Sequence, residues 1–372
     1  MAMDVLRDAK ALERAGRSII HLELGEPGAA APRRVREAAV ESLRHGAIGY
    51  GEALGDAPLR ARIARHYGER YGVEVAPDRV IIATGSSGGF LIAFLAAFDA
   101  GARIAVTAPG YPAYANILSA LGLEPVLLDV GEETRFAPTA AMLEAAHREK
   151  KLHGALFMSP ANPTGAMIER EELARICAFC DEAGIIFVSD EIYHGLEYER
   201  RAETALRFSQ RAIVINSFSK YYAMTGWRLG WLVAPPELMR PLERLQQSLA
   251  ICAPTLSQHA ALAAFDAVDE LETNRAVYAR NRAFLLERLP QLGLNKFAPP
   301  DGAFYIYADV SRFTDDSIAF CRRMLHEAGV ATTPGVDFDP RRGARTLRIS
   351  YAGPEAELRE GVARLESWLK TS

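Results

Sequence analysis

The residues of this chain that are best suited to chemistry lie in one stretch, residues 217–230, which reads SFSKYYAMTGWRLG. Aromatic residues and glycines surround two serines, a lysine and an arginine, which are Ser217, Ser219, Lys220 and Arg228. A lysine amine that is shielded from water has a lowered pKa and can attack a carbonyl carbon to form a Schiff base. An arginine and two hydroxyls supply the charge and the donors that a phosphate group needs. A lysine beside a phosphate site is the expected signature of pyridoxal 5'-phosphate, which carries an aldehyde and a phosphate on one ring.

An isolated lysine of this kind is more often structural or solvated, so the assignment depends on the elements around it. Seven short apolar runs are predicted to form strands, at residues 80–83, 104–108, 125–128, 155–158, 185–188, 212–215 and 229–234. Helical stretches separate most of them, at residues 90–99, 114–121, 138–150 and 170–183. Near-continuous apolar strands that alternate with helices are typical of a mostly parallel sheet covered on both faces. We therefore predict an α/β fold with a mostly parallel, seven-stranded sheet in a large domain.

Ligands of open α/β sheets bind outside the carboxyl ends of the strands, so the residues after each run test for a shared site. After the first run, Gly85, Ser86 and Ser87 open a helix, whose free backbone N–H groups and dipole favour an anion. After the second run, Tyr111 places an aromatic ring beside the same edge.

Two further strand ends carry polar side chains. Asn162 follows the fourth run between Pro160 and Pro163, which fix its backbone, and either X-Pro bond is a candidate for the cis form. Asp190 and Tyr193 follow the fifth run. Taken singly, the asparagine could hold a turn, the aspartate could cap a helix and the tyrosine could belong to the core. Because five strand ends deliver complementary groups to one edge, a shared site is the better explanation.

The composition is typical of a globular protein with a large core. Of the 372 residues, 49% are apolar and 24% are charged. We expect a large ligand-binding domain at residues 40–285 and a smaller α+β domain formed by residues 1–39 and 286–372. Long helices fill residues 236–289, and we expect the last of them to bridge the two domains.

Charge and hydropathy argue against several other classes of function. The net charge of −4 gives no electrostatic reason to expect a nucleic acid or an anionic membrane as partner. No apolar run reaches about 18 residues and the N-terminus shows no signal-peptide pattern, so we expect a cytoplasmic protein. Cys177 and Cys180 have CxxC spacing within a helical pattern, without a second pair or a histidine cluster. We therefore expect buried cysteines and no metal site.

Taken together, the motifs resemble the class I and II aminotransferases of pyridoxal-phosphate fold type I, the aspartate aminotransferase superfamily. The resemblance covers nearly the whole chain and includes, in the family order, LGEP, ATGSSGG, PGYP, NPTG, SDEIY, SFSK, GWRLG, DGAFY, TPG and RISYA. Any one motif alone is weak, whereas the combination is very specific. The resemblance implies a homodimeric enzyme that moves an amino group from an L-amino acid to a 2-oxo acid. The transfer would proceed through a Lys220 Schiff base and a pyridoxamine intermediate.

The resemblance also implies roles for individual residues. Lys220 would hold the cofactor and carry a proton between substrate and cofactor, and Asp190 would pair with the protonated pyridine nitrogen, which keeps the ring an electron sink. Asn162 and Tyr193 would hydrogen-bond the phenolic oxygen of the ring, and Tyr111 would stack on it. The phosphate would be held by Gly85, Ser86, Ser87, Ser217, Ser219, Arg228 and, from the partner subunit, Tyr50. From the residues alone, that tyrosine is either a loop aromatic at a subunit boundary or a ligand contact.

The substrate's α-carboxylate is expected to meet Arg348, whose planar guanidinium can bind it through two hydrogen bonds. The alternative, a surface arginine in a salt bridge, is weakened by its place in the strand-like TLRISYA. The resemblance adds the Gly25 N–H and Asn162 to this substrate site. Ser87 stands where acid-specific relatives often have a lysine for a second carboxylate, and Gly28-Ala29 replaces the DF that usually follows LGEP. We therefore expect neutral or aromatic amino donors rather than aspartate.

Two other functions remain open. A C–S lyase or a decarboxylase on the same scaffold would share the lysine and the aspartate, but a lyase would release ammonia together with pyruvate or another fragment. A ligand-sensing domain of a transcription regulator is the second alternative. Such regulators also carry a DNA-binding domain, and the net negative charge of this chain disfavours binding to DNA.

Overall fold

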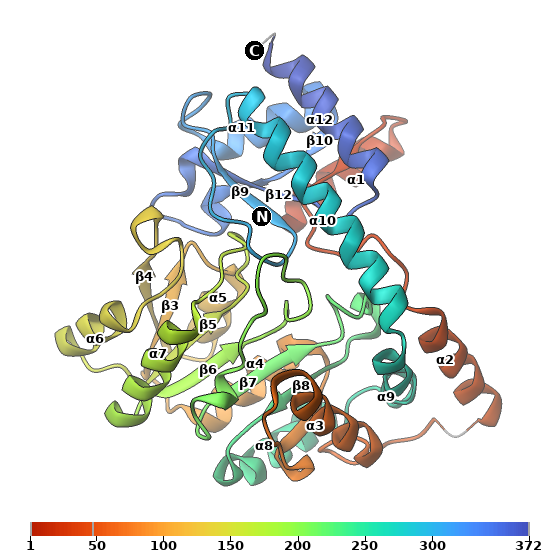
Figure 1. Cartoon of the computed structure of the whole chain (residues 1–372), viewed down its shortest axis with the longest axis vertical. Helices are drawn as coiled ribbons and strands as arrows, with labels where there is room; N and C mark the ends of the chain where they lie inside the picture. The colour runs from red at the N-terminus through yellow and green to blue at the C-terminus, as the bar shows by residue number, and fades with distance from the viewer. Residues whose placement is uncertain (1, 47, 371–372) are drawn as a thin grey trace.

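The computed structural model describes residues 2–46 and 48–370, and its centre is a seven-stranded sheet (Figure 1). The strand order is β2-β8-β7-β6-β5-β3-β4. The strands are β2 (Val80–Ala83), β3 (Arg103–Ala108), β4 (Glu124–Asp129), β5 (Gly154–Met158), β6 (Ile186–Asp190), β7 (Ile213–Ser217) and β8 (Gly230–Val233). Each coincides with a predicted apolar run, which confirms the predicted α/β class and the number of strands.

All strands of this sheet but one run in the same direction. β8 pairs antiparallel with β2 and with β7, whereas the other paired strands are parallel. Six carboxyl ends therefore lie at one edge of the sheet. The segments that follow these ends are placed to build a single site, as expected for an open α/β sheet.

Helices cover both faces of the sheet because its strands are apolar on both sides. Ile81 and Ile215 belong to one buried cluster, whereas their neighbours Ile82 and Val214 belong to the other. The helices of this part are α3 (Ala57–Tyr71), α4 (Gly85–Ala97), α5 (Pro112–Ala120), α6 (Ala140–Glu149), α7 (Arg170–Ala183), α8 (Pro236–Ala250) and α9 (Thr255–Leu262). Short 3₁₀ turns join them at Pro77–Arg79, Glu132–Thr134, Ala205–Arg207, Thr225–Trp227 and Ala263–Asp266.

The two ends of the chain meet in a smaller α+β part. β1 (Ile20–His21) pairs parallel with β10 (Val330–Ala331). A separate antiparallel sheet has the order β11-β12-β9, formed by β11 (Thr333–Pro334), β12 (Thr346–Ser350) and β9 (Tyr305–Asp309). Around them lie α1 (Ala2–Arg14), α11 (Ser317–Arg323), a π-helical turn (Met324–Ala328), α12 (Glu355–Leu369) and 3₁₀ turns at Gly335–Asp337 and Gly343–Arg345.

One long helix, α10 (Val268–Gln291), runs from the region of the large sheet to α12 (Figure 1). α2 (Arg33–His45) packs against α9. The predicted boundary between residues 39 and 40 falls inside α2, and the division into domains remains a prediction.

Several local expectations can be compared with the structure. Residues 18–24 (SIIHLEL) alternate like a short strand, but only Ile20–His21 pair as one, because the chain then leaves β10 and Leu22 O accepts the Ser350 N–H at 2.8 Å. Both predicted cis candidates, Ser159-Pro160 and Asn162-Pro163, are cis. The two cysteines of the CxxC spacing are free and buried. Within the described residues, no helix is long and apolar enough to cross a membrane.

Candidate active site

The carboxyl edge of the sheet opens onto a cavity of about 490 Å³. Most residues predicted for the site line it, namely Gly25, Ser86, Ser87, Tyr111, Asn162, Asp190, Tyr193, Ser219, Lys220, Arg228 and Arg348. They come from the carboxyl ends of five different strands and the segments that follow them, from β12 and from the N-terminal segment. A second cavity of about 670 Å³ lies between α3 and the start of α10, and it is lined by none of the predicted residues.

Lys220 lies in the loop after β7, and its Nζ donates a hydrogen bond to the Gly25 carbonyl oxygen at 2.6 Å. Burial, aided by the positive charge of Arg348, lowers the pKa of its amine to about 8. Within the described part of the chain, no carboxylate forms an ion pair with it. Near neutral pH a far larger fraction of this amine is therefore neutral and nucleophilic than for an ordinary lysine, and half of it is neutral at about pH 8.

Asp190 ends β6 and is 1% exposed. Its Oδ1 accepts the Ile192 N–H at 3.0 Å, and its Oδ2 accepts a short hydrogen bond from the Tyr114 hydroxyl. Burial raises the pKa of this carboxyl to about 7. The described residues provide it with no ion-pair partner, so a bound cation at this position would restore its ionised form.

An anion site lies at the start of α4. The helix begins at Gly85, and no described side chain caps its first turn, so its first N–H groups are free to bind a ligand. Gly85 has a φ of +68°, and a Cβ added there would lie 2.6 Å from Nη2 of Arg228. The close approach of this guanidinium to the helix start therefore requires glycine at this position.

The serines of the SFSK motif differ in position. Ser219 lines the cavity, whereas Ser217 does not. The Ser217 hydroxyl is 2.8 Å from Oγ of Ser219 and 2.9 Å from the Leu229 carbonyl oxygen. Its predicted phosphate contact would thus require a rearrangement of these bonds, while Ser219 and Arg228 already face the cavity.

Arg348 lies in β12, is 4% exposed and is not a surface residue. Its guanidinium lies over the rings of Tyr305 and Phe338, at 4.4 and 4.7 Å from their centroids. Nη1 donates to Oδ1 of Asn162 at 2.8 Å, and Nη2 donates to the Glu23 carbonyl oxygen. Nε is buried without a hydrogen-bond partner, and no carboxylate of the described residues pairs with this charge. A buried, unpaired arginine at a cavity wall calls for an anionic ligand.

The contact with Arg348 also orients Asn162. Because Oδ1 of the amide accepts from the guanidinium, the donor Nδ2 is left for another partner in the cavity. The Asn162 backbone N–H lies 3.1 Å from Sδ of Met158. The side chain therefore presents a hydrogen-bond donor to any ligand that fills the space.

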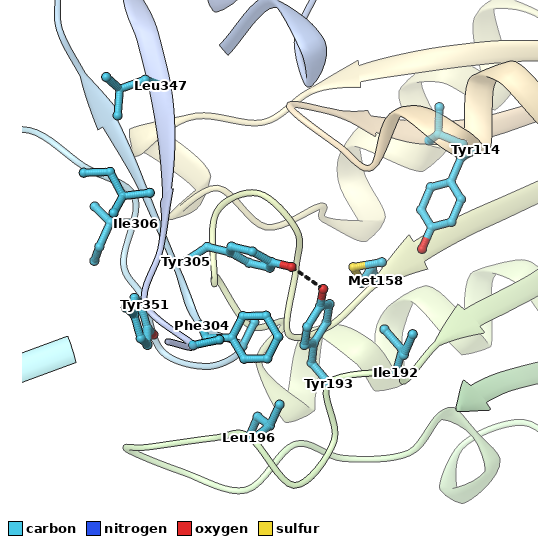
Figure 2. Close-up of a cluster of buried hydrophobic side chains, with 14 of the residues drawn as sticks. Tyr114, Met158, Ile192, Tyr193, Leu196, Phe304, Tyr305, Ile306, Leu347 and Tyr351 are labelled. Atoms are coloured by element: carbon cyan, nitrogen blue, oxygen red, sulfur yellow. Dashed lines mark hydrogen bonds between the residues drawn. The ribbon is translucent and has the colours of Figure 1, made fainter. Parts of the chain in front are cut away.

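Two aromatic residues of the site were not predicted. Figure 2 shows the Tyr305 hydroxyl of β9 pointing toward the Tyr193 hydroxyl, at a distance of 2.6 Å. The Tyr305 hydroxyl also occupies the space beside Gly25, where an added Cβ would lie only 1.9 Å away. Tyr114 is the other. Its hydroxyl donates to Oδ2 of Asp190, and its ring stands edge-on to that of Tyr111, with 5.3 Å between the ring centroids. Tyr305 lies within the DGAFY motif, which was the only sequence signal for it.

Two predicted residues take positions that the single chain does not fully explain. Tyr50 is 83% exposed and does not line the cavity of its own chain. Gly25 contributes its carbonyl to Lys220, and its N–H donates to no acceptor among the described residues. The exposed tyrosine agrees with a contact to another subunit, and the free N–H agrees with a contact to a ligand.

The set of donors fits pyridoxal 5'-phosphate. The cavity has an amine of lowered pKa, a buried carboxylate without a cation, an uncapped helix start beside an arginine, and a second, buried arginine without an anion. An aldehyde, a protonated ring nitrogen, a phosphate and a substrate carboxylate would satisfy these four groups in turn. Among the described residues, no group of three or more histidine, cysteine or acidic side chains is arranged to hold a metal ion.

Comparison with known proteins gives a consistent result. Residues 17–365 match the family described as aminotransferase class I and II. A valine–pyruvate aminotransferase of Mycobacterium tuberculosis is 51% identical over 99% of this chain and 95% of its own length. A (5-formylfuran-3-yl)methyl phosphate transaminase of Methanocaldococcus jannaschii is 36% identical over 99% of this chain and 96% of its own.

Solved structures agree with these relatives. The crystal structure of an aminotransferase from Mycobacterium tuberculosis has a TM-score of 0.97 at 50% identity, covering 100% of this chain and 96% of its own. The aspartate aminotransferase of Thermus thermophilus with maleate has a TM-score of 0.93 at 31% identity, covering 98% and 96%.

Proposed function

Because the chain belongs to the class I and II aminotransferases and transfers an amino group between an amino acid and a 2-oxo acid, we propose that it does so with pyridoxal 5'-phosphate bound covalently at Lys220. The observation that carries this proposal is the position of Lys220 and Asp190 in one cavity. Burial in this cavity lowers the pKa of the Lys220 amine, which favours its reactive neutral form. It raises the pKa of the Asp190 carboxyl, which has no cationic partner among the described residues. When bound, the cofactor supplies an electron sink for the substrate's Cα–H bond cleavage.

The residues around the cavity divide the task of holding the cofactor. Ser86, Ser87 and Ser219, with the free N–H groups of α4 and the guanidinium of Arg228, would hold the phosphate. Tyr111 would cover the ring. Asn162 Nδ2 and the Tyr193 hydroxyl would donate to the phenolic oxygen, since Oδ1 of the asparagine is occupied by Arg348 and Tyr305 can donate to the Tyr193 oxygen.

Lys220 and Asp190 would perform the proton chemistry. The carboxylate of Asp190, which accepts from the Tyr114 hydroxyl and the Ile192 N–H, would keep the proton on the ring nitrogen. As a free amine, Nζ of Lys220 would take the proton from the substrate's Cα, which a neutral amine can do. Its lowered pKa, about 8, makes that neutral form far more populated near neutral pH than in an ordinary lysine.

Arg348 would bind the substrate's α-carboxylate. Its Nε lacks a partner, and its Nη1 is held by Asn162, so the fork is fixed in place before the substrate arrives. The free N–H of Gly25 would add a second donor. Because these groups are positioned in advance, little conformational freedom is lost when the substrate binds.

We further propose that the preferred substrates carry one carboxylate only. The lysine and arginines that line the cavity are Lys220, Arg228 and Arg348, and each already has a task. The other charged residues that line it are acidic, namely Glu23, Glu26, Asp190 and Asp337. A second carboxylate would therefore meet repulsion rather than a partner. The relative named for valine and pyruvate supports neutral donors and a pyruvate-like acceptor.

A single-turnover experiment with a panel of donors tests both proposals. The cofactor-loaded protein is mixed with one amino acid at a time, without acceptor, and the released products are identified. We expect one equivalent of 2-oxo acid per active site, with valine and alanine faster than aspartate and glutamate. Release of ammonia with a fragmented product would instead indicate a lyase. The highest kcat/KM with aspartate would contradict the proposed substrate class.

A homodimer belongs to the same proposal. Large apolar side chains are exposed on α2, on the loop that follows it and at the end of α8, namely Val40, Leu43, Ile48, Tyr50, Leu249 and Ile251. These segments lie together, because the Gly51 N–H is 3.3 Å from Sγ of Cys252 and the Thr255 hydroxyl donates to the Gly49 carbonyl. Exposed apolar side chains on neighbouring segments favour burial against a second copy. A cytoplasmic location likewise stays a proposal.

A further inference from the structure

One buried network beside the site has no role in the function proposed above. His194 follows Tyr193 directly, is 6% exposed, and uses both ring nitrogens. Its Nε2 is 3.0 Å from the Ser159 carbonyl oxygen, and its Nδ1 is 2.7 Å from the Tyr71 hydroxyl. The Tyr71 oxygen is also 3.1 Å from Nε of Arg70.

The chemistry of these partners determines the tautomer of His194. A backbone carbonyl can only accept, so Nε2 must carry the hydrogen. The guanidinium of Arg70 can only donate, so the Tyr71 oxygen accepts from it and the Tyr71 O–H is free to donate to Nδ1. The result is a chain of hydrogen bonds that all point the same way, from Arg70 through Tyr71 and His194 to the Ser159 carbonyl.

A charged imidazole is the alternative, because Oε2 of Glu191 lies 3.5 Å from Nδ1. Burial and the nearby positive charge of Arg70 lower the pKa of His194 well below its ordinary value. Burial also raises the pKa of Glu191 to about 8, so this carboxyl is mostly protonated at neutral pH. Its Oε1 already accepts from Thr204 and from the Ala205 N–H, both at 2.9 Å. The surroundings of His194 therefore favour the neutral ring.

His194 joins the two segments that supply donors to the cofactor's phenolic oxygen. Its own backbone belongs to the turn that carries Tyr193, where its N–H donates to the Glu191 carbonyl at 3.0 Å. Its Nε2 donates to the carbonyl oxygen of Ser159, which lies three residues before Asn162 in the same loop. That loop is fixed independently at Oγ of Ser159, which accepts the Ile168 N–H at 3.0 Å. A change at His194 would consequently alter the spacing of the two donors rather than unfold either segment.

We propose that His194, as its Nε2–H tautomer, is a positioning residue that sets the spacing of Asn162 and Tyr193 and thereby the acidity of the cofactor's phenolic oxygen. The inference rests on the proposed cofactor and on the two donors. When a donor is displaced, the oxygen holds its shared proton more tightly, so the pH midpoint of the cofactor's absorbance change rises.

The tautomer is tested first in the wild-type protein without cofactor. Nitrogen-15 NMR of the histidine rings distinguishes a protonated Nε2 from a protonated Nδ1 and from the imidazolium. We expect one ring with hydrogen on Nε2 that does not titrate between about pH 6 and 8, and His194→Gln removes that signal. A protonated Nδ1, or titration in this range, would overturn the proposal. This readout needs no cofactor, so it also stands if the cofactor assignment fails.

The effect on the cofactor is tested by pH titration of the loaded protein. We expect the absorbance midpoint of His194→Phe to rise by about one pH unit, and that of His194→Gln, which keeps a donor for Ser159, to rise less. His147→Phe is the control, since His147 accepts the Leu152 N–H at 3.2 Å on α6, outside the cavity. We expect that variant to lose stability with an unchanged midpoint.

A purely structural role makes a different prediction. An unchanged midpoint in loaded His194→Phe, or an equal shift in His147→Phe, would refute the positioning role. Should His194→Phe fail to fold, Tyr71→Phe removes the donor to Nδ1 while keeping the imidazole. A smaller rise of the midpoint supports the proposal, and no rise contradicts it.

Discussion

At the scale of the residue, burial acts on the two central groups in opposite senses. It lowers the pKa of the Lys220 amine to about 8 and raises the pKa of the Asp190 carboxyl to about 7, because both lose their hydration. The first effect makes the amine reactive. The second leaves a carboxylate whose charge is stabilised in part by the Tyr114 hydroxyl and the Ile192 N–H and would be stabilised further by a cation bound beside it. A ligand with an aldehyde and a basic ring nitrogen satisfies both.

The lysine gives a pH prediction. Only the neutral amine attacks an aldehyde, so the rate at which apoprotein captures the cofactor should rise about tenfold per pH unit below pH 8 and level off above it. The positive charge of Arg348 contributes to this low pKa, so Arg348→Gln should move the profile to higher pH. Stopped-flow absorbance measures both. A profile that stays flat between pH 6 and 9 would show that the amine is not the group that reacts.

The aspartate gives a prediction about turnover. Asp190→Asn keeps the shape of the side chain but removes the charge opposite the ring nitrogen, so we expect kcat to fall on the order of 10³-fold or more. The matched control is Asp181→Asn on α7, where, among the described residues, the carboxylate accepts only from the Ser209 hydroxyl at 2.9 Å. Steady-state kinetics of both variants decide the matter. A fall of less than about tenfold at position 190 would contradict the assigned role.

At the scale of the element, the site depends on where strands end and helices begin. β6 ends at Asp190, the loop after β7 presents Lys220, and α4 begins at Gly85 without a side-chain cap. Each of these positions follows from an apolar run that stops at polar or small residues. The parallel arrangement then brings groups that are far apart in sequence to the same edge.

The start of α4 can be tested with a matched pair of glycines. Gly85→Ala forces a left-handed conformation at a cost of about 1–2 kcal/mol and displaces Arg228, so the Kd of the cofactor should rise about tenfold or more. Gly88→Ala meets only an ordinary contact, 3.5 Å from Cβ of Thr84, and should leave binding unchanged or stabilise the helix. Fluorescence titration of the apoproteins measures both. If the two variants bound the cofactor with equal affinity, the start of α4 would not be the phosphate site.

The strands, and the gathering of the candidate residues at one edge of the sheet, could be predicted because their signals are local. An uninterrupted apolar run such as residues 155–158 is the direct consequence of burial on both faces. The contact between Tyr193 and Tyr305 spans 112 residues, and no local pattern specifies it. The same holds for the hydrogen bond from Tyr114 to Asp190. The inward position of Ser217 also escaped prediction, because it depends on the Leu229 carbonyl of a neighbouring segment.

At the scale of the whole molecule, the two ends of the chain complete the cavity. Arg348 comes from β12, and the carbonyl that receives its Nη2 belongs to Glu23, which lies 325 residues earlier. The N-terminal segment also supplies the Gly25 carbonyl to Lys220. In the proposed function, the smaller α+β part would thus provide the carboxylate site, and the large sheet would provide the groups for the cofactor.

The exposed apolar surface gives a prediction about assembly. Leu43 on α2 is 56% exposed, and Leu43→Arg should prevent a second copy from packing there, so the protein should become monomeric. If Tyr50 reaches a neighbouring phosphate, the monomer should also bind the cofactor less tightly. Ile318→Arg is the control, because Ile318 is 46% exposed on α11 in the smaller part. Analytical ultracentrifugation with cofactor titration tests this, and a wild-type monomer would disprove it.

The central claim is that one amine, Nζ of Lys220, holds the cofactor. Borohydride reduction of the cofactor-loaded protein, followed by proteolysis and mass spectrometry, fixes any such bond and locates it. We predict one cofactor per chain, attached at Lys220, and no attachment in Lys220→Ala under the same conditions. Attachment at a different lysine, or an unlabelled wild-type protein that still converts amino acids, would contradict the account.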